Sequence, residues 1–191
     1  MKENPPKYIG LTGLNASGKG TAAQYLIDKG YTYYSLSDIV REEAAALGRD
    51  HSRENLIYVG NKLRKEQGPA VLAKRIVEKI VRARGRVPVR VRVVIDSIRN
   101  AAETNELRKL PGFILIGVDA PVEIRFKRAK NRGRVGFEKS LQEFIAVEQK
   151  ENSEDPNKQQ LFECLKMADF KIINDGTEEE LKSKINSFFR K

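Results

Sequence analysis

The feature that most constrains this chain is a glycine-rich segment between an apolar run and an amphipathic stretch. Residues 13–21 read Gly-Leu-Asn-Ala-Ser-Gly-Lys-Gly-Thr; they follow the apolar residues 8–11 and lead into helical spacing over 19–29 that stops at Gly30. A strand, a glycine loop and a helix start in this order cradle phosphate, because backbone N–H groups and the positive helix end point at the anion. The sequence therefore predicts a phosphate-binding loop, or P-loop.

Each residue type in this loop suits a nucleoside triphosphate. Glycines let the backbone approach phosphate oxygens closely, Lys19 offers a cation to the β- and γ-phosphates, and the Thr21 hydroxyl suits Mg²⁺. The strict pattern has Ser or Thr directly after Lys, whereas this chain has Gly20 there. We predict ATP and Mg²⁺ as cofactors. The residues expected to bind the nucleotide are Gly13, Asn15, Ala16, Ser17, Gly18, Lys19, Gly20, Thr21 and Asn174.

Beyond the loop, short apolar runs alternate with helical patterns. The expected strands are 8–11, 31–36, 91–95, 113–118 and 170–173. The expected helices are 19–29, 39–47 with Ser37 and Asp38 as N-cap, 53–84 broken at Gly68-Pro69, 101–110, about 122–130, 141–151, 156–167 and 178–189. The alternation predicts an α/β, three-layer P-loop NTPase fold with a five-stranded parallel sheet, whose ligands bind beyond the carboxyl ends of the strands.

A chain of 191 residues is long enough for one substantial core and short for two domains. We expect a single kinase-type domain over 1–191, with a helical acceptor-binding region at about 38–86 and a small lid at about 128–140. The lid includes a glycine- and arginine-rich stretch over 131–136, which we interpret as a mobile loop.

Composition excludes several classes of protein. No apolar run is long enough for a membrane span, and the polar first residues lack a secretory signal, so we expect a cytoplasmic protein. One cysteine, Cys164, cannot form an intramolecular disulfide, and with a single histidine, His51, it cannot build a Cys/His metal cage. We interpret His51 as a loop residue and Cys164 as a packing residue. The expected assembly is a monomer or a homodimer.

The formal net charge of +10 indicates attraction to polyanions, either nucleic acid or phosphorylated small molecules. The basic residues are dispersed over many predicted helices and are not interleaved with aromatic residues, so the stacking platform of a single-strand binder is missing. A small phosphorylated acceptor is therefore favoured over nucleic acid as the partner.

Several segments resemble adenylate kinases and related nucleoside monophosphate kinases. Residues 18–21, Gly-Lys-Gly-Thr, match their version of the loop. Residues 35–42, Ser-Leu-Ser-Asp-Ile-Val-Arg-Glu, resemble the Thr-Gly-Asp-x-x-Arg segment whose arginine holds the acceptor's phosphate. Residues 94–99, Val-Ile-Asp-Ser-Ile-Arg, lie where those enzymes have an aspartate at the end of the third strand and then an acceptor loop. Arg128 and Arg132 resemble the arginines at the start of their lid.

The resemblance, together with the positions at strand ends, implies a division of roles. Lys19 and Mg²⁺ would neutralise charge on the transferred phosphoryl group, and two lid arginines would close over the donor. Asp96 would orient Mg²⁺-bound water or accept a proton from an acceptor hydroxyl. Asp38 could instead cap its helix, and Asn174 could border the base or cap the last helix. The expected catalytic residues are Lys19, Asp96, Arg128 and Arg132; the metal ligands Thr21 and Asp96; the acceptor-binding residues Asp38, Arg41, Arg64 and Arg99.

Two further resemblances leave the acceptor open. Residues 168–177 are similar to the closing signature of dephospho-coenzyme A kinases, and the strings Ser-Leu-Ser-Asp-Ile, Ile-Asp-Ser-Ile-Arg-Asn and Gly-Val-Asp-Ala-Pro resemble a kinase-like domain fused to certain deoxycytidylate deaminases. The chain departs from adenylate kinases at Asn15, where they have proline, and in Asp-Ser-Ile-Arg-Asn, where they have Asp-Gly-Phe-Pro-Arg. It departs from dephospho-coenzyme A kinases at Gly20, where they have serine.

The leading hypothesis is an ATP- and Mg²⁺-dependent kinase that phosphorylates a nucleoside or deoxynucleoside monophosphate. Dephospho-coenzyme A is the alternative acceptor. A nucleotide-sensing module with little turnover is an alternative of another class, and a nucleic-acid-associated ATPase is a third class that only the net charge suggests.

Overall fold

The sheet of this protein is five-stranded and wholly parallel, in a computed structural model that describes residues 5–84, 91–132 and 140–189. Its spatial order is β2-β3-β1-β4-β5, so β1 lies at the centre. The strands are β1 (Tyr8–Thr12), β2 (Tyr31–Ser35), β3 (Arg92–Asp96), β4 (Phe113–Asp119) and β5 (Phe170–Ile173). The expected α/β fold with a five-stranded parallel sheet is confirmed.

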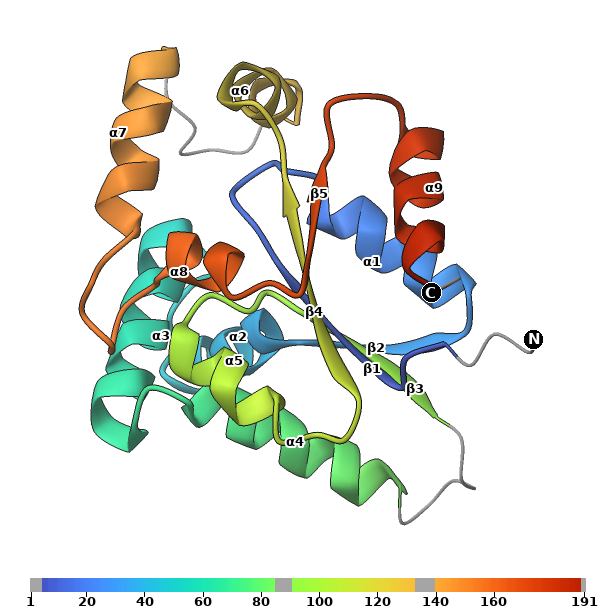
Figure 1. Ribbon diagram of the computed structural model, residues 1–191. Coiled ribbons are helices and arrows are strands. Elements are labelled where there is room, and N and C mark those ends of the chain that lie inside the picture. The colour runs from blue at the N-terminus through green and yellow to red at the C-terminus, as the bar shows by residue number, and fades with distance from the viewer. Residues whose placement is uncertain (1–4, 85–90, 133–139, 190–191) are drawn as a thin grey trace.

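Helices cover both faces of this sheet, as Figure 1 shows. On one face, α1 and α9 pack against a cluster of buried apolar residues that includes Leu26 and Leu181. The other face carries a larger cluster, with Leu72 and Ile76 among its members, under α2 to α5 and α8. The helices are α1 (Lys19–Asp28), α2 (Leu36–Ala46), α3 (Arg53–Gln67), α4 (Val71–Arg84), α5 (Ala101–Leu107), α6 (Val122–Asn131), α7 (Leu141–Glu151), α8 (Leu161–Lys166) and α9 (Glu178–Phe189).

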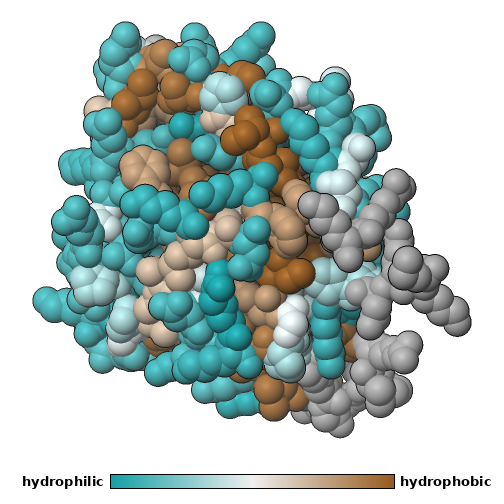
Figure 2. All heavy atoms as spheres, in the orientation of Figure 1, coloured by the Kyte–Doolittle hydropathy of each residue, from teal (hydrophilic) through white to brown (hydrophobic). Residues whose placement is uncertain are grey.

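The carboxyl ends of the parallel strands meet at one edge, because the register pairs Ser35 with Asp96 and Asp119 with Ile173. The P-loop leaves β1 at this edge, and α6 begins beyond the end of β4 (Figure 1). Apolar side chains reach the surface over α6 and α7 and near the centre of the face in Figure 2, while hydrophilic side chains cover most of the rest of it.

Two expected helix starts are wrong. Ser35 caps α2, since its backbone is extended and its Oγ accepts a hydrogen bond from the Ser37 backbone N–H at 3.2 Å. Ser37 and Asp38 therefore lie in the first turn instead of capping the helix. The helix expected over 156–167 begins only at residue 161, because the Asn100 side chain binds the Pro156 and Lys158 carbonyls and holds that segment in turns.

Candidate active site

The P-loop backbone is fixed by close contacts that only glycine permits. At Gly13 the φ angle is +146°, and a Cβ atom would lie 1.9 Å from the backbone oxygen of Val118. At Gly18 the φ angle is +107°, and a Cβ would lie 2.1 Å from Nδ2 of Asn174. The same Nδ2 donates a hydrogen bond to the Ser17 carbonyl at 2.8 Å. The ends of β4 and β5 thus hold the loop against the start of α1.

Lys19 lies inside this loop with its ammonium bonded to neutral groups. Nζ donates to the carbonyl oxygens of Gly13 at 2.6 Å and of Leu14 at 2.8 Å. Burial, with the charge of the neighbouring Arg99 as the second cause, lowers the pKa of Lys19 to about 7, although the charge of Asp96 opposes the shift. Phosphate oxygens are stronger acceptors for an ammonium than carbonyls, so the loop is suited to an anionic ligand.

Asp96, at the end of β3, faces the same region and is buried. Its Oδ2 accepts hydrogen bonds from the Tyr33 hydroxyl at 3.2 Å and from Ser97 Oγ at 3.4 Å. Among the described residues, its Oδ1 and Ser17 Oγ are buried without a hydrogen-bond partner. Burial, then the charge of Asp96, raises the pKa of Tyr33 to about 12, so Tyr33 stays a donor.

The side-chain oxygens of Asp96 and Thr21 suit the magnesium ion that the fold family implies. Mg²⁺ prefers oxygen ligands and is commonly held by one or two carboxylates together with the phosphates of the substrate. Asp96 Oδ1 and the hydroxyl of Thr21 are ligands of this kind, and the buried Asp96 oxygen lacks another partner in the described part of the chain. In that part, His, Cys, Asp and Glu side chains form no group of three that could hold a metal by themselves.

Beside the loop lies a cavity of about 460 Å³, within the range of small-molecule sites. Its walls come from α2, α3, the segment after β3 and the end of α7, and they combine apolar side chains with arginines. The polar and charged residues that line it include Asn15, Arg41, His51, Arg53, Arg64, Arg99, Glu151 and Gln159.

Arg99 lines the cavity, and its charge acts on Lys19 of the P-loop. Its backbone N–H is bound by Glu103 Oε2 at 3.0 Å, and its carbonyl accepts from the Gln160 N–H at 2.7 Å, so the segment that carries it is rigidly placed. The guanidinium donates to Gln159 Oε1 at 3.1 Å, and its buried Nε has no hydrogen-bond partner among the described residues. Burial lowers the pKa of Arg99, opposed first by the charge of Glu151. An anion in the cavity would complete its hydrogen bonds.

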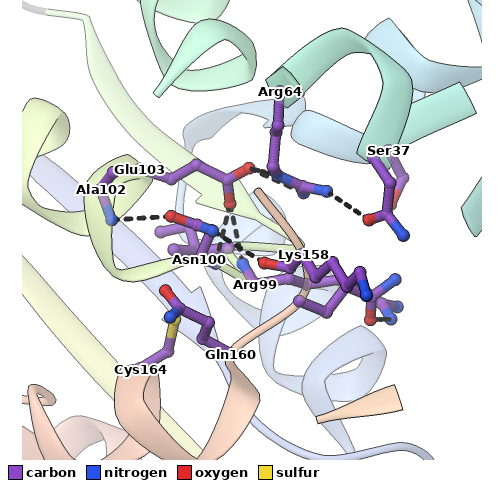
Figure 3. A network of polar contacts seen from close by, with 12 residues as sticks. Ser37, Arg64, Arg99, Asn100, Ala102, Glu103, Lys158, Gln160 and Cys164 are labelled. Atoms are coloured by element: carbon purple, nitrogen blue, oxygen red, sulfur yellow. Dashed lines mark hydrogen bonds and ion pairs between the residues drawn. The ribbon is translucent and has the colours of Figure 1, made fainter. Parts of the chain in front are cut away.

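Arg64, expected to bind the acceptor, lines the cavity but is already paired. It is buried, and its Nε and NH2 donate to Oε1 of Glu103 at 2.9 and 2.8 Å. Figure 3 shows the two side chains meeting above Asn100, whose backbone N–H also binds Glu103. Arg64 therefore forms part of the wall that supports Arg99.

The other two expected acceptor residues differ in position. Arg41 lines the cavity, and its NH1 binds Asp38 at 2.6 Å in an exposed ion pair. Asp38 lies outside the cavity wall formed by the described residues. Its carboxylate orients Arg41 from the solvent side.

The two arginines expected in the lid, Arg128 and Arg132, lie on α6 and at its carboxyl end. Arg128 NH1 donates to the Asn174 carbonyl at 3.0 Å, next to the clamp on Ser17. Burial lowers the pKa of Arg128, and the charge of Arg132 lowers it further. Arg132 itself is exposed at the end of α6. The rest of the expected lid, residues 133–139, lies outside the described residues.

Two ion pairs around the site, one buried and one partly buried, could not be predicted from the sequence. Arg125 on α6 pairs with Glu148 on α7, and Arg53 at the start of α3 pairs with Glu151 at the end of α7. One signal was present, since Glu148 and Glu151 follow Phe144 at a spacing that shares one helix face. Their partners are not visible in the sequence.

Two further residues singled out in the sequence, Cys164 and His51, occupy positions of the expected kind. Burial raises the pKa of the Cys164 thiol to about 12, so this residue packs as expected. His51 is an exposed loop residue at the rim of the cavity, also as expected. Within the described ranges, every helix is too short or too polar to cross a membrane.

Comparison with known proteins identifies relatives of this chain. The family model AAA_17, described as an AAA domain, matches residues 12–145. A UPF0200/UPF0201 protein of Archaeoglobus fulgidus is 36% identical over 97% of this chain, which spans only 55% of that protein's length. The UPF0200 protein of Pyrococcus horikoshii is 33% identical over 95% of this chain and 95% of its own.

Solved structures share the fold along nearly the whole chain. TT1252 from Thermus thermophilus has a TM-score of 0.62 at 23% identity and covers 98% of both chains. Shikimate kinase from Acinetobacter baumannii, solved with shikimate, has a TM-score of 0.55 at 17% identity, covering 98% of this chain and 94% of its own. A gluconokinase from Sinorhizobium meliloti has a TM-score of 0.53 at 13% identity, covering 97% and 92%. The family model and these shared folds confirm the expected P-loop superfamily and three-layer fold.

Proposed function

The chain belongs to the AAA_17 domain family and to the UPF0200 family, and from that premise we propose an ATP- and Mg²⁺-dependent kinase that phosphorylates a nucleoside or deoxynucleoside monophosphate. The observation that carries the proposal is the placement of Arg99. It lines the cavity and lowers the pKa of Lys19 by its charge, so an anion bound to Arg99 would lie close to the phosphates bound by Lys19.

The P-loop supports the donor half of the proposal. Gly13 and Gly18 let the loop pack closely against the ends of β4 and β5. Lys19 would exchange its two carbonyl partners for β- and γ-phosphate oxygens. Thr21 and Asp96 would hold Mg²⁺, which supplies neutralisation of phosphate charge when bound. Asn174, Arg128 and Arg132 would border the donor, since Asn174 bonds to Ser17 of the loop and accepts a hydrogen bond from Arg128.

The cavity supports the acceptor half. An arginine can bind a phosphate with two parallel hydrogen bonds, and both Arg41 and Arg99 line the wall. A phosphate oxygen of a monophosphate attacks without needing a base to remove a proton, so the acceptor needs positioning and charge neutralisation. Arg99 serves both purposes, because it is held from behind by Glu103 and Gln160.

Dephospho-coenzyme A remains the second candidate acceptor because of Asp96. Its attacking group is a hydroxyl, and the partnerless Oδ1 of Asp96 could take the hydroxyl proton. A monophosphate acceptor would instead leave that oxygen for Mg²⁺.

The test is an ADP-release assay with ATP and Mg²⁺ against nucleoside monophosphates, deoxynucleoside monophosphates and dephospho-coenzyme A. We expect one monophosphate to raise turnover by orders of magnitude. Lys19→Ala should lower kcat/KM by at least about 100-fold, as removal of a transition-state contact does. Lys74→Ala, at an exposed lysine of α4, is the matched control and should leave turnover unchanged.

Other outcomes would change the proposal in defined ways. Stimulation by dephospho-coenzyme A alone would assign the second acceptor. If ATP binds and no acceptor stimulates ADP release, the kinase proposal fails and a nucleotide-sensing role is the better account.

A further inference from the structure

One carboxylate lies among the cations of the acceptor cavity. Glu151, the last residue of α7, accepts hydrogen bonds from Arg53 Nε and NH2, both at 2.6 Å. Its Oε2 also accepts from Asn15 Nδ2 in the P-loop at 3.2 Å. The Glu151 side chain is 9% exposed, and all three residues line the cavity. Glu151 thus ties α7 to both α3 and the phosphate-binding loop.

The charge of Glu151 also acts on Arg99. Two carboxylate charges raise the pKa of Arg99, and that of Glu151 has a larger effect than that of Asp96. In the described part of the chain, no hydrogen bond joins Glu151 to Arg99, and the buried Nε of Arg99 has no hydrogen-bond partner. One carboxylate therefore balances two arginines while bonding directly to only one of them.

This geometry is the one an anionic ligand would use. Arginine binds carboxylate and phosphate through the same planar pair of N–H groups, and a phosphate offers more acceptor oxygens than a carboxylate. A phosphate between Arg53 and Arg99 could bond to both guanidinium groups. The carboxylate on α7 satisfies only the first of them.

We infer that the Glu151 carboxylate holds the place of the acceptor's anionic group, and that the acceptor binds Arg53 together with Arg99 by displacing it. This inference rests on the proposed phosphorylated acceptor. It adds Arg53 to the acceptor-binding residues. It also couples acceptor binding to release of α7 from α3 and the P-loop, because the displaced carboxylate is the group that joins all three.

The test measures binding of inorganic phosphate by calorimetry, at constant ionic strength, so it needs no turnover. Glu151→Gln removes the competing charge but keeps the side-chain shape, and we expect phosphate affinity to rise about tenfold, equivalent to one charge-assisted hydrogen bond. Glu151→Gln combined with Arg53→Gln should lose that gain. Glu143→Gln, on the first turn of the same helix, retains its capping role and should leave the affinity unchanged.

A second set of variants distinguishes phosphate bound in the cavity from phosphate bound in the P-loop, which is also expected to bind it. The gain from Glu151→Gln should persist in Lys19→Ala protein. A gain that disappears there would place the phosphate in the P-loop and overturn the inference. So would a Glu151→Gln variant with a lower melting temperature and unchanged or weaker phosphate affinity, since Glu151 would then be a structural link only. Failure of the kinase assay would leave these binding results intact, so the two proposals fail separately.

Discussion

At the scale of single residues, the decisive arrangement is the buried ammonium of Lys19, which donates hydrogen bonds to the backbone carbonyl oxygens of Gly13 and Leu14. Burial disfavours the charged form of Lys19 and brings its pKa down to about 7, with Arg99 as the second cause. Bound triphosphate would add several negative charges beside the same nitrogen. The pKa of Lys19 should then return towards its ordinary value near 10.5.

This shift predicts proton uptake when ATP binds. At pH 8 Lys19 is mostly neutral in the free protein and charged in the complex, so binding should take up about one proton. Uptake should fall as pH drops below 7, where Lys19 is charged in both states. Calorimetric titration at pH 8 in buffers of different ionisation enthalpy measures it directly.

Lys19→Met is the control, because it keeps the side-chain length and cannot take up a proton. Uptake that remains in this variant would assign the proton to another group. Zero proton uptake in the unaltered protein would mean that Lys19 is already protonated at pH 8 before ATP binds.

The residues of the loop could be predicted from sequence because they are consecutive. Glycine is required at 13 and 18 by a positive φ and a close neighbour, and the pattern alone indicated both positions. Asn174 was predicted from its own segment, but its bond to the Ser17 carbonyl spans 157 positions. The Arg53–Glu151 pair spans 98 positions, and no local pattern records which acid meets which base at such a distance.

At the scale of elements, the acceptor wall depends on a buried ion pair between α3 and α5. Arg64 and Glu103 have side chains 4% and 0% exposed. The second oxygen of Glu103 binds the backbone N–H groups of Arg99 and Asn100, so the pair joins a helix contact to the placement of Arg99. The helix positions could be predicted from the sequence, but Arg64 was expected to bind the acceptor, because helical spacing does not reveal a partner on another helix.

Breaking this pair should be costly. Arg64→Leu leaves Glu103 as an uncompensated buried charge, and we expect the free energy of unfolding to fall by about 3 kcal/mol or more. Arg64→Lys keeps the charge but cannot donate the same pair of hydrogen bonds, so its loss should be smaller. Urea denaturation followed by circular dichroism measures both.

Arg82→Leu is the matched control, since Arg82 pairs with Glu78 one turn away on α4 and its side chain is 81% exposed. It should change stability by less than about 0.5 kcal/mol. An equal loss of unfolding free energy in Arg64→Leu and Arg82→Leu would show that the buried pair contributes no more to stability than the exposed pair.

At the scale of the whole molecule, two apolar clusters lie on opposite faces of one sheet. Residues of the same strand contribute to both clusters: Tyr8 and Leu11 on β1, and Val93 and Val94 on β3. This follows from alternation of side chains along a strand that is buried on both faces. The apolar strand sequences predicted a doubly covered sheet, but the extent of each cluster depends on helix packing that the sequence does not specify.

Shared strands predict that both faces unfold together, which is also the test of the expected single domain. Leu72→Ala on one face and Leu26→Ala on the other each remove a fully buried side chain, so each should cost about 2–5 kcal/mol. In both variants, the unfolding transitions seen by far-UV circular dichroism and by tyrosine fluorescence should coincide. Leu47→Ala, at a leucine 44% exposed, should shift neither. Tyr25 and Tyr31 lie in the Leu26 cluster, so a fluorescence transition that precedes the circular dichroism transition in Leu26→Ala would mean that this face unfolds independently, contrary to the prediction.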